Sequence, residues 1–309
     1  MKRTQILAVV LASSVFMGCA LGSSSSTSAS TKSIVNGDAA DDTADDDDNS
    51  SDKGKTTTAA AATPTIEEAV VYDADGIKIT AKEYVSDSIW GDGIKFLVEN
   101  ETDKNIAVTT NALIVNNYML SDGFYADVAA GMKTNETMDL STSQLRQAGI
   151  DIIGQIEIYF HIYDTDSYDS IADPDCILLK TSLFDQMDTK ADDEGTVLYD
   201  ADGIKIVGKY VDDDDFWGAA VLLYIENNSD RNVGIQTENF SVNGFTINSY
   251  FSATVYAGKK SYDDITLLSS ELEENDITSV EEIKLNFTIF DPDTYDTITK
   301  SDDIVFQAK

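Results

Sequence analysis

The chain contains Val71-Tyr72-Asp73-Ala74-Asp75-Gly76-Ile77-Lys78-Ile79 and, further on, Leu198-Tyr199-Asp200-Ala201-Asp202-Gly203-Ile204-Lys205-Ile206. Position 72 corresponds to position 199, so the second copy follows the first at an offset of 127 residues. Solenoid units have periods of about 20 to 50 residues, whereas a repeat of this length is the size of a whole domain. The sequence therefore predicts two copies of one domain, each of which serves as a comparison for the other.

The same offset relates shorter motifs along the chain; Trp90-Gly91, for example, returns as Trp217-Gly218. We place the first domain at residues 66–184, a linker at 185–193 and the second domain at 194–309. Each domain has about 115 residues, which is enough to bury roughly two-thirds of its unfolded surface in one core.

Both domains show the two-residue period of half-buried strands. Residues 155–164 alternate apolar and polar side chains, and the second copy alternates in the same register. This pattern is typical of a strand with one face on a core. We expect these side chains to point inward: Ile156, Ile158, Phe160 and Ile162, with Ile283, Leu285, Phe287 and Ile289 in the second copy. Their polar neighbours, Glu157 and His161 among them, are expected to face outward.

Turn signals separate the predicted strands. Asn243-Gly244 is a hairpin signal, and Asn116-Asn117 is its variant in the first copy, because Asn also accepts a positive φ. Asp75-Gly76 and Asp202-Gly203 mark another turn. Strands this short, joined by turns this close together, favour an antiparallel sandwich.

One helical signal interrupts the strands. The capping box Ser270-Glu271-Leu272-Glu273 predicts a single short helix, and its counterpart at 143–146 ends before Gly149, a typical C′ residue. We therefore expect an all-β fold of two tandem immunoglobulin-like antiparallel β-sandwich domains, each with one short helix.

Two motifs recur in both copies, Tyr-Asp-x-Asp-Gly-Ile-Lys-Ile and Trp-Gly, and four more stand in the second copy: Ile-Glu-Asn-Asn-Ser-Asp, Ser-Val-Asn-Gly, Ala-Gly-Lys-Lys and Phe-Asp-Pro-Asp. Together they resemble an uncharacterised immunoglobulin-like domain of surface lipoproteins from Gram-positive anaerobes. The resemblance covers both domains, and nearly every motif in it is a turn or a core position. It implies the fold and a surface location, and it implies no activity and no catalytic residue.

The N-terminus is typical of an exported bacterial lipoprotein. Lys2 and Arg3 precede an apolar run at 6–16, which is too short for a permanent membrane span. Phe16-Met17-Gly18-Cys19 resembles the lipoprotein box, although Phe16 departs from the usual Leu. We expect residues 1–19 to form a signal peptide, with Cys19 retained and acylated, and the protein to be anchored by lipid at the extracytoplasmic face of the membrane. Ordinary secretion with cleavage nearby is the alternative.

Residues 20–64 form a predicted stalk rich in Ser, Thr, Asp and Ala. Low hydrophobicity and clustered like charge do not offset the entropy of ordering, so we expect this segment to be disordered. The only cysteine besides Cys19 is Cys176, which excludes an intrachain disulfide in the mature domains. Because its counterpart is Asp303, we interpret Cys176 as an incidental thiol.

The sequence argues against an enzyme. His161 is the only histidine, and the second copy has Thr288 in its place. Serine and cysteine hydrolases need a positioned histidine, and zinc sites draw on His and Cys ligands. A pair of carboxylates for glycoside hydrolysis carries no information in a chain with 56 acidic residues.

Two acidic loops are the remaining candidates for a metal. The residues are Asp164, Asp166 and Asp169, with Asp291, Asp293 and Asp296 in the second copy. Carboxylate oxygens spaced along a loop are ligands that calcium requires. The favoured interpretation is that these aspartates are solvated turn residues, for which Asp is a common choice. We therefore expect no metal and no cofactor, and calcium at these loops is the one candidate left open.

Recurring aromatic residues raise a second binding hypothesis, that of a carbohydrate platform. They are Trp90 with Trp217, and Tyr168 with Tyr295. A Trp beside Gly at a strand entrance is, alternatively, a core residue. The net charge of −35 excludes nucleic acid, whose binding depends on Lys and Arg. The expected partners are the membrane, through the lipid anchor, and an unknown protein or glycan; residues 212–215, an acidic run in the second copy only, are interpreted as a solvated loop.

Overall fold

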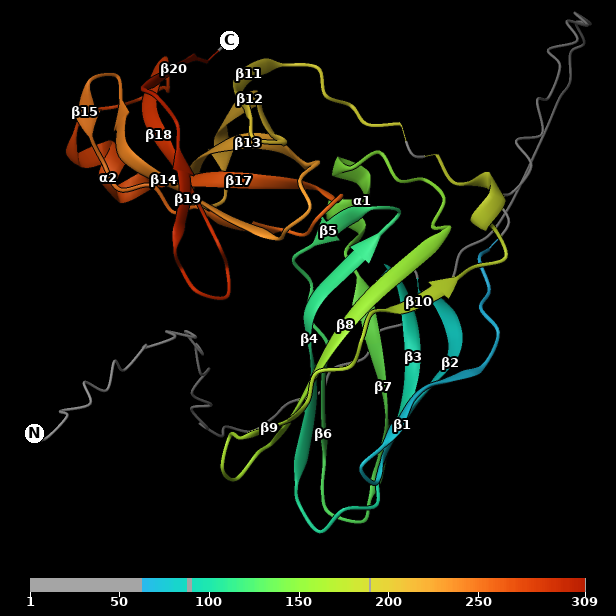
Figure 1. The fold of residues 1–309 in the computed structure, drawn as a ribbon. Helices are drawn as coiled ribbons and strands as arrows, with labels where there is room; N and C mark the ends of the chain where they lie inside the picture. Colours follow the sequence, from blue (N-terminus) through green and yellow to red (C-terminus); the bar gives the residue numbers. More distant parts are fainter. Residues whose placement is uncertain (1–62, 88–90, 189, 309) are drawn as a thin grey trace, which may run out of the picture. The chain divides into compact units, whose positions relative to one another are not determined.

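The computed structural model describes residues 63–87, 91–188 and 190–308. The predicted signal peptide with Cys19, nearly all of the predicted stalk, and Trp90 lie outside these residues. These residues form one compact unit, built almost entirely of antiparallel strands (Figure 1). No helix in the described ranges has the length and apolar character needed to cross a membrane.

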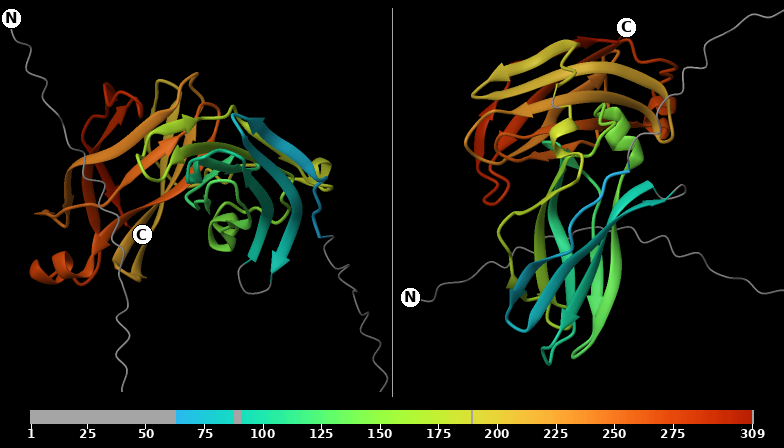
Figure 2. Two further views of the ribbon diagram at one scale, coloured as in Figure 1. Left: turned by 90° about the horizontal axis from the view of Figure 1, so that it is seen from below. Right: turned by 90° about the vertical axis from the view of Figure 1, so that its right-hand side faces the viewer.

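The first repeat is a sandwich of two sheets. One sheet has the spatial order β1 (Ala69–Ala74), β2 (Ile77–Asp87), β3 (Gly91–Asn100) and β7 (Lys133–Leu140). The other has the order β10 (Ile177–Lys180), β8 (Gln155–Asp164), β4 (Ile106–Val115) and β5 (Tyr118–Leu120), with β6 (Tyr125–Val128) also on β4 and β9 (Ser170–Ala172) on β8. Helix α1 (Thr142–Gln147) follows β7, and a 3-10 turn, η1 (Phe184–Gln186), follows β10. The two layers are visible in Figure 2.

The second repeat has the same strands and the same helix in the same order, without a counterpart of η1 in the described residues. Its first sheet contains β11 (Thr196–Ala201), β12 (Ile204–Asp215), β13 (Gly218–Asn227) and β17 (Lys260–Leu268), and it joins the second sheet of the first repeat where β17 pairs with β5. Its second sheet contains β15 (Phe245–Thr246), β14 (Val233–Val242), β18 (Glu282–Phe290) and β19 (Thr297–Lys300), with β16 (Ser252–Val255) on β14 and β20 (Ile304–Gln307) on β18. Helix α2 (Ser269–Glu274) again follows the last strand of the first sheet. The duplication predicted from the sequence is thus a duplication of the whole strand order.

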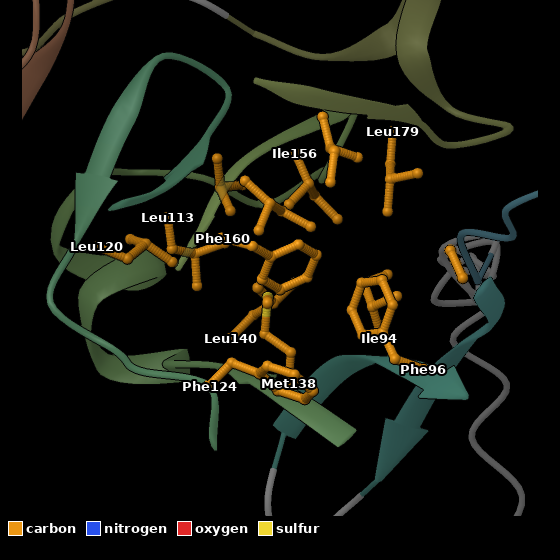
Figure 3. Packing of buried hydrophobic residues seen from close by; sticks show 14 of the residues in the cluster. Ile94, Phe96, Leu113, Leu120, Phe124, Met138, Leu140, Ile156, Phe160 and Leu179 are labelled. Atoms are coloured by element: carbon orange, nitrogen blue, oxygen red, sulfur yellow. The ribbon is translucent and has the colours of Figure 1, made fainter. Parts of the chain in front are cut away.

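The core lies between the two sheets of each repeat and confirms the predicted strand faces. All eight side chains expected to point inward from β8 and β18 are at most 3% exposed. In the first repeat, the rings of Phe96, Phe124 and Phe160 lie 5.5–5.7 Å apart at tilted or edge-on angles (Figure 3). Such geometry is preferred between aromatic rings, so strands β3 and β8 and the residue just before β6 are held together at one point.

The predicted turns are confirmed by their backbone angles. Asn243 and Gly244 have φ of 51° and 86°, as a type I′ hairpin requires, and Asn116 and Asn117 have φ of 47° and 77°. Asn116 and Asn243 also fix the following segment: the side-chain oxygen of each accepts two backbone N–H groups at the start of β8 or β18. The recurring Asn is therefore both a turn residue and a cross-link.

A second pair of asparagines cross-links each sandwich from inside. Asn100 is 1% exposed and its amide donates to the carbonyls of Lys104 and Val128, at 2.8 and 3.0 Å. Asn227, fully buried, donates in the same way to the carbonyls of Arg231 and Val255. The shared Glu-Asn motif is thus explained by the fold, because these bonds satisfy buried backbone groups.

The two helices begin differently. In α1 the Ser141 hydroxyl accepts from the backbone N–H of Gln144, and Gly149, with φ of 66°, ends the helix as predicted. The capping box predicted at Ser270 is wrong: α2 starts at Ser269, and its N-cap residue is Leu268, without a side-chain cap. The Glu271 carboxylate accepts instead from the backbone N–H and the amide of Asn248.

Glu157 is not exposed, contrary to the sequence-based expectation. The Lys259 ammonium lies 2.6 and 2.8 Å from its two carboxylate oxygens, and both side chains are largely buried. The same lysine donates to the side-chain oxygen of Asn117, and β5 pairs with β17 next to it. The charge of Lys259 is what makes the burial of Glu157 tolerable. Each position has a different residue in the other copy, Lys284 for Glu157 and Met132 for Lys259.

Candidate functional site

The acidic loops after β8 and β18 are built around one aspartate each. Asp164 accepts the backbone N–H groups of Asp166 and Ser167 on one oxygen, at 2.9 and 3.3 Å. Asp291 accepts the equivalent N–H groups of Asp293 and Thr294, at 2.9 and 3.1 Å. Hydrogen bonds to the ionised carboxylate stabilise it, so the pKa of Asp291 is lowered by its backbone donors.

Calcium is not favoured by this arrangement. The second oxygen of Asp164 lies 3.0 Å from the Lys104 ammonium. This lysine is the largest cause that lowers the pKa of the carboxyl, and the backbone donors are a smaller one. A calcium ion would have to displace this lysine. Within the described part of the chain, no three His, Cys, Asp or Glu side chains are grouped so as to hold a metal ion. The alternative, that Asp164 and Asp291 are turn residues, accounts for their contacts.

Each of these loops presents a tyrosine at its tip. Tyr168 and Tyr295 have the same left-handed backbone, with φ of 61° in both, and their side chains are 79% and 76% exposed. The ring of Tyr168 stacks on Tyr163 at 6.2 Å, and the ring of Tyr295 stacks on Phe290 at 5.9 Å. One neighbouring ring orients each tyrosine, while most of its surface is left open. We call residues 164–169 and 291–296 the tyrosine turns.

Two exposed carboxylates flank each tyrosine. Asp166 and Asp169 do so in the first tyrosine turn, and Asp293 and Asp296 in the second. The six acidic positions singled out from the sequence therefore divide into two groups. Asp164 and Asp291 shape the turn, and the other four surround an exposed ring.

The aromatic surface is longer in the first repeat than in the second. His161 stacks on Tyr163 at 5.6 Å, and its Nδ1 lies 2.7 Å from a carboxylate oxygen of Asp173. Tyr125 is 58% exposed, and partial desolvation of its ring, followed by the charge of Asp127, raises its pKa. In the second copy Thr288 and Ser252 occupy the positions of His161 and Tyr125.

His161 does not form a nucleophile–base pair. Asp173 also accepts from the Ser170 hydroxyl, at 3.2 Å, so Ser170 donates to the carboxylate and not to the imidazole. Cys176 is exposed, and its sulfur lies 3.9 Å from the Glu157 carboxylate. These contacts describe a polar strand surface and give no catalytic arrangement.

Trp217 does not occupy the core, so the interpretation of a Trp beside Gly as a core residue is wrong here. Its side chain is 61% exposed and packs edge-on against Phe216, which is 87% exposed. Both residues belong to the β12–β13 turn, in which Asp215 accepts the backbone N–H of Trp217. The turn carries the indole past the end of the sheets, so the core cannot cover it. Residues 212–215, expected to be a loop, lie instead at the end of strand β12, where they pair with β13. Asp213 is exposed, and its carboxylate accepts from the backbone N–H of Val280.

Sequence reasoning missed a cleft in the first repeat. The cleft has a volume of about 450 Å³ and lies between α1, the loop after it, and strands β2 and β3. Its polar lining includes Tyr84, Asp92, Arg146 and Asp151. The signal that could have found it is the contrast between copies, because all four positions change in the second repeat.

Comparisons with known proteins leave the family open. No family model matches the chain, and no curated protein matches it. Among solved structures, a transglutaminase from red sea bream is 12% identical, with a TM-score of 0.21, over 77% of this chain and 32% of that one. A protein of unknown function from Porphyromonas gingivalis is 9% identical, with a TM-score of 0.19, over 71% of this chain and 90% of that one. A calcium-binding mutant of β-glucuronidase 2 from Bacteroides uniformis is 10% identical, with a TM-score of 0.22, over 73% of this chain and 28% of that one. These likenesses are too weak to carry a functional argument.

Proposed function

We propose that this protein is a non-enzymatic, lipid-anchored binding protein of the bacterial cell surface, and that its tyrosine turns bind glycans. The observation that carries the proposal is the recurrence of an exposed tyrosine with left-handed backbone in both copies. A bulky residue is rarely found with positive φ, and the conformation costs on the order of 1–2 kcal/mol. Gly, Asn or Asp would serve the turn better, so selection for stability alone does not account for two tyrosines.

The chemistry around each tyrosine suits a sugar. The C–H face of a sugar ring packs against an aromatic ring, and Tyr168 and Tyr295 each offer an open ring surface. The flanking carboxylates accept hydrogen bonds from sugar hydroxyls. Because the chain carries a net charge of −35, we expect a neutral or amine-bearing glycan and not an anionic wall polymer.

The export signal, the anchor at Cys19 and the stalk complete the proposal. A stalk of this length, as a flexible coil, would average roughly 35 to 40 Å end to end. It would hold the binding domains away from the lipid surface. A Cys19→Ala variant should appear in the culture medium and not in the membrane fraction, whereas continued membrane retention would count against the anchor.

Binding is tested with the full-length chain on an array of neutral and N-acetylated oligosaccharides. We expect the wild type to bind at least one glycan class, and the variant Tyr168→Ala with Tyr295→Ala to lose that binding. Tyr250→Ala is the matched control, because Tyr250 is 53% exposed but lies outside the tyrosine turns. Absence of glycan binding by the wild type, or equal loss in the control, would refute the proposed ligand.

A further inference from the structure

The cleft beside α1 in the first repeat combines an apolar floor with charges of both signs. Its floor contains the buried residues Leu145, Ile150, Ile153 and Leu183. Its volume of about 450 Å³ falls in the range of small-molecule sites, which span about 300–1,000 Å³. Its lining comes from the first repeat and from Thr63, Pro64 and Gln186 directly beside it, and it shares no residue with the tyrosine turns.

The charged groups of the cleft are not used by the fold. Arg146, Asp92 and Asp151 make no ion pair with any residue in the described ranges. Arg146 and Asp151 are exposed at the mouth, and Asp92 is partly buried on β3. An unpaired guanidinium beside two unpaired carboxylates leaves donors and acceptors for a ligand that itself carries both charges.

Tyr84 in the wall of the cleft is also not optimised for stability. Its hydroxyl oxygen is buried and lies near the Asp92 carboxylate, without a well-formed hydrogen bond to any described residue. Burial is the main cause that raises the pKa of Tyr84, and the nearby charge of Asp92 adds to it, so the phenol stays protonated. A buried donor without an acceptor opposes folding, and a fold under selection for stability alone would place an apolar side chain here.

The second repeat shows that the scaffold does without these groups. Val211 replaces Tyr84 and packs against the core, and the buried Ala219 replaces Asp92. Glu273 replaces Arg146, and Thr278 replaces Asp151. The same helix, strands and loop form in both copies, so the polar set is an addition to the first repeat and not a requirement of the sandwich.

We infer that this cleft is a second binding site, for a small zwitterion with an apolar body, that is, an apolar amino acid or a short apolar peptide. The guanidinium of Arg146 would take the ligand carboxylate, since its planar fork matches a carboxylate in two hydrogen bonds. Asp92 and Asp151 would take the ammonium group. The apolar floor under α1 would take the side chain. The inference does not depend on glycan binding by the tyrosine turns.

Calorimetric titration of the full-length chain with L-leucine and with the dipeptide Leu-Leu tests the site. It also distinguishes a free amino acid from a short peptide as the ligand. We expect saturable binding of at least one, weakened tenfold or more when the ligand is N-acetylated or carboxyl-amidated. Arg146→Glu, which introduces the residue of the second repeat, should weaken binding at least tenfold, and so should Asp92→Ala. Glu273→Arg in the second repeat is the matched control and should bind as the wild type does.

Three results would overturn the inference. One is the absence of saturable heat with both probes. The other is unchanged affinity in Arg146→Glu and Asp92→Ala, each checked by thermal melting to be folded. Loss of binding confined to Tyr168→Ala would likewise overturn it, because that would assign the ligand to a tyrosine turn.

Discussion

Tyr168 and Tyr295 lie at equivalent positions of the two repeats and share a φ of 61°, an exposed side chain and an aromatic ring beneath them. The rings that support them differ, Tyr163 in one copy and Phe290 in the other. The conformation of the tip is therefore common to both copies while its support has changed. That is the pattern expected when the exposed tyrosine, and not the surface under it, is under selection.

Replacing the tip tyrosine by glycine should separate stability from binding. In Tyr168→Gly the strain of a bulky residue at positive φ is removed. This gain offsets the lost ring stacking, which is worth about 0.5–1.5 kcal/mol. We expect the free energy of unfolding in urea to stay within about 1 kcal/mol of the wild type. A loss well beyond that would show that Tyr168 is a structural residue and would weaken the binding proposal.

The buried asparagines should be far more important for stability than exposed ones. Asn100→Ala leaves buried carbonyls without donors, and we expect it to cost about 3 kcal/mol, with a similar cost for Asn227→Ala. Asn111→Ala, at an exposed position on β4, is the control and should change stability by less than about 0.5 kcal/mol. Equal effects at Asn100 and Asn111 in chemical unfolding would contradict the cross-link.

Asp263 on β17 should make stability depend on pH. Burial raises its pKa to about 6, against the lowering effect of its hydrogen bond from Ser261. Because the pKa in the folded state lies above that in the unfolded state, this group favours folding when protonated. Its contribution is complete below about pH 4 and is lost as the pH rises through 6, at a cost of up to about 3 kcal/mol.

The Asp263→Asn variant isolates this effect. Unfolding of the variant and the wild type is compared at intervals between pH 4 and pH 8. We expect the stability of the wild type to fall relative to that of Asp263→Asn over this range. Parallel curves would show that the carboxyl of Asp263 titrates near its ordinary value.

The Lys259–Glu157 pair should couple strongly because it is shielded from water. In a double-mutant cycle of Lys259→Met and Glu157→Gln, we expect a coupling energy of about 1–3 kcal/mol. The more exposed pair Lys300–Glu238 is the control, with an expected coupling below about 1 kcal/mol. Equal coupling energies for the two pairs would contradict the role of burial.

Local sequence patterns predicted the parts of the fold that depend on neighbours in the chain. Alternation identified the buried faces of β8 and β18, and Asn-Gly and Asp-Gly identified turns with positive φ. Those features follow from backbone geometry alone. The 127-residue offset then carried each prediction from one copy to the other.

Features that depend on distant residues were not predicted. The N-terminus of α2 has no capping box, because the helix begins at Ser269 and so places Ser270 inside its first turn. Glu271 contacts Asn248, which is 23 positions away. Glu157 is buried through Lys259, which is 102 positions away. Of the candidate site, the sequence identified the recurring tyrosines and aspartates but not their division between turn formation and exposure. The cleft was missed because its polar residues are scattered along the chain and are replaced in the second copy.

Glycan binding by the tyrosine turns can be measured by titrating a glycan identified on the array into four full-length proteins. These are the wild type, Tyr168→Gly, Tyr295→Gly and the double variant. If both turns engage one polymeric ligand, each single variant should bind at least tenfold more weakly and the double variant should not bind measurably. If the double variant is folded and binds the glycan as tightly as the wild type, the tyrosine turns are not the binding elements.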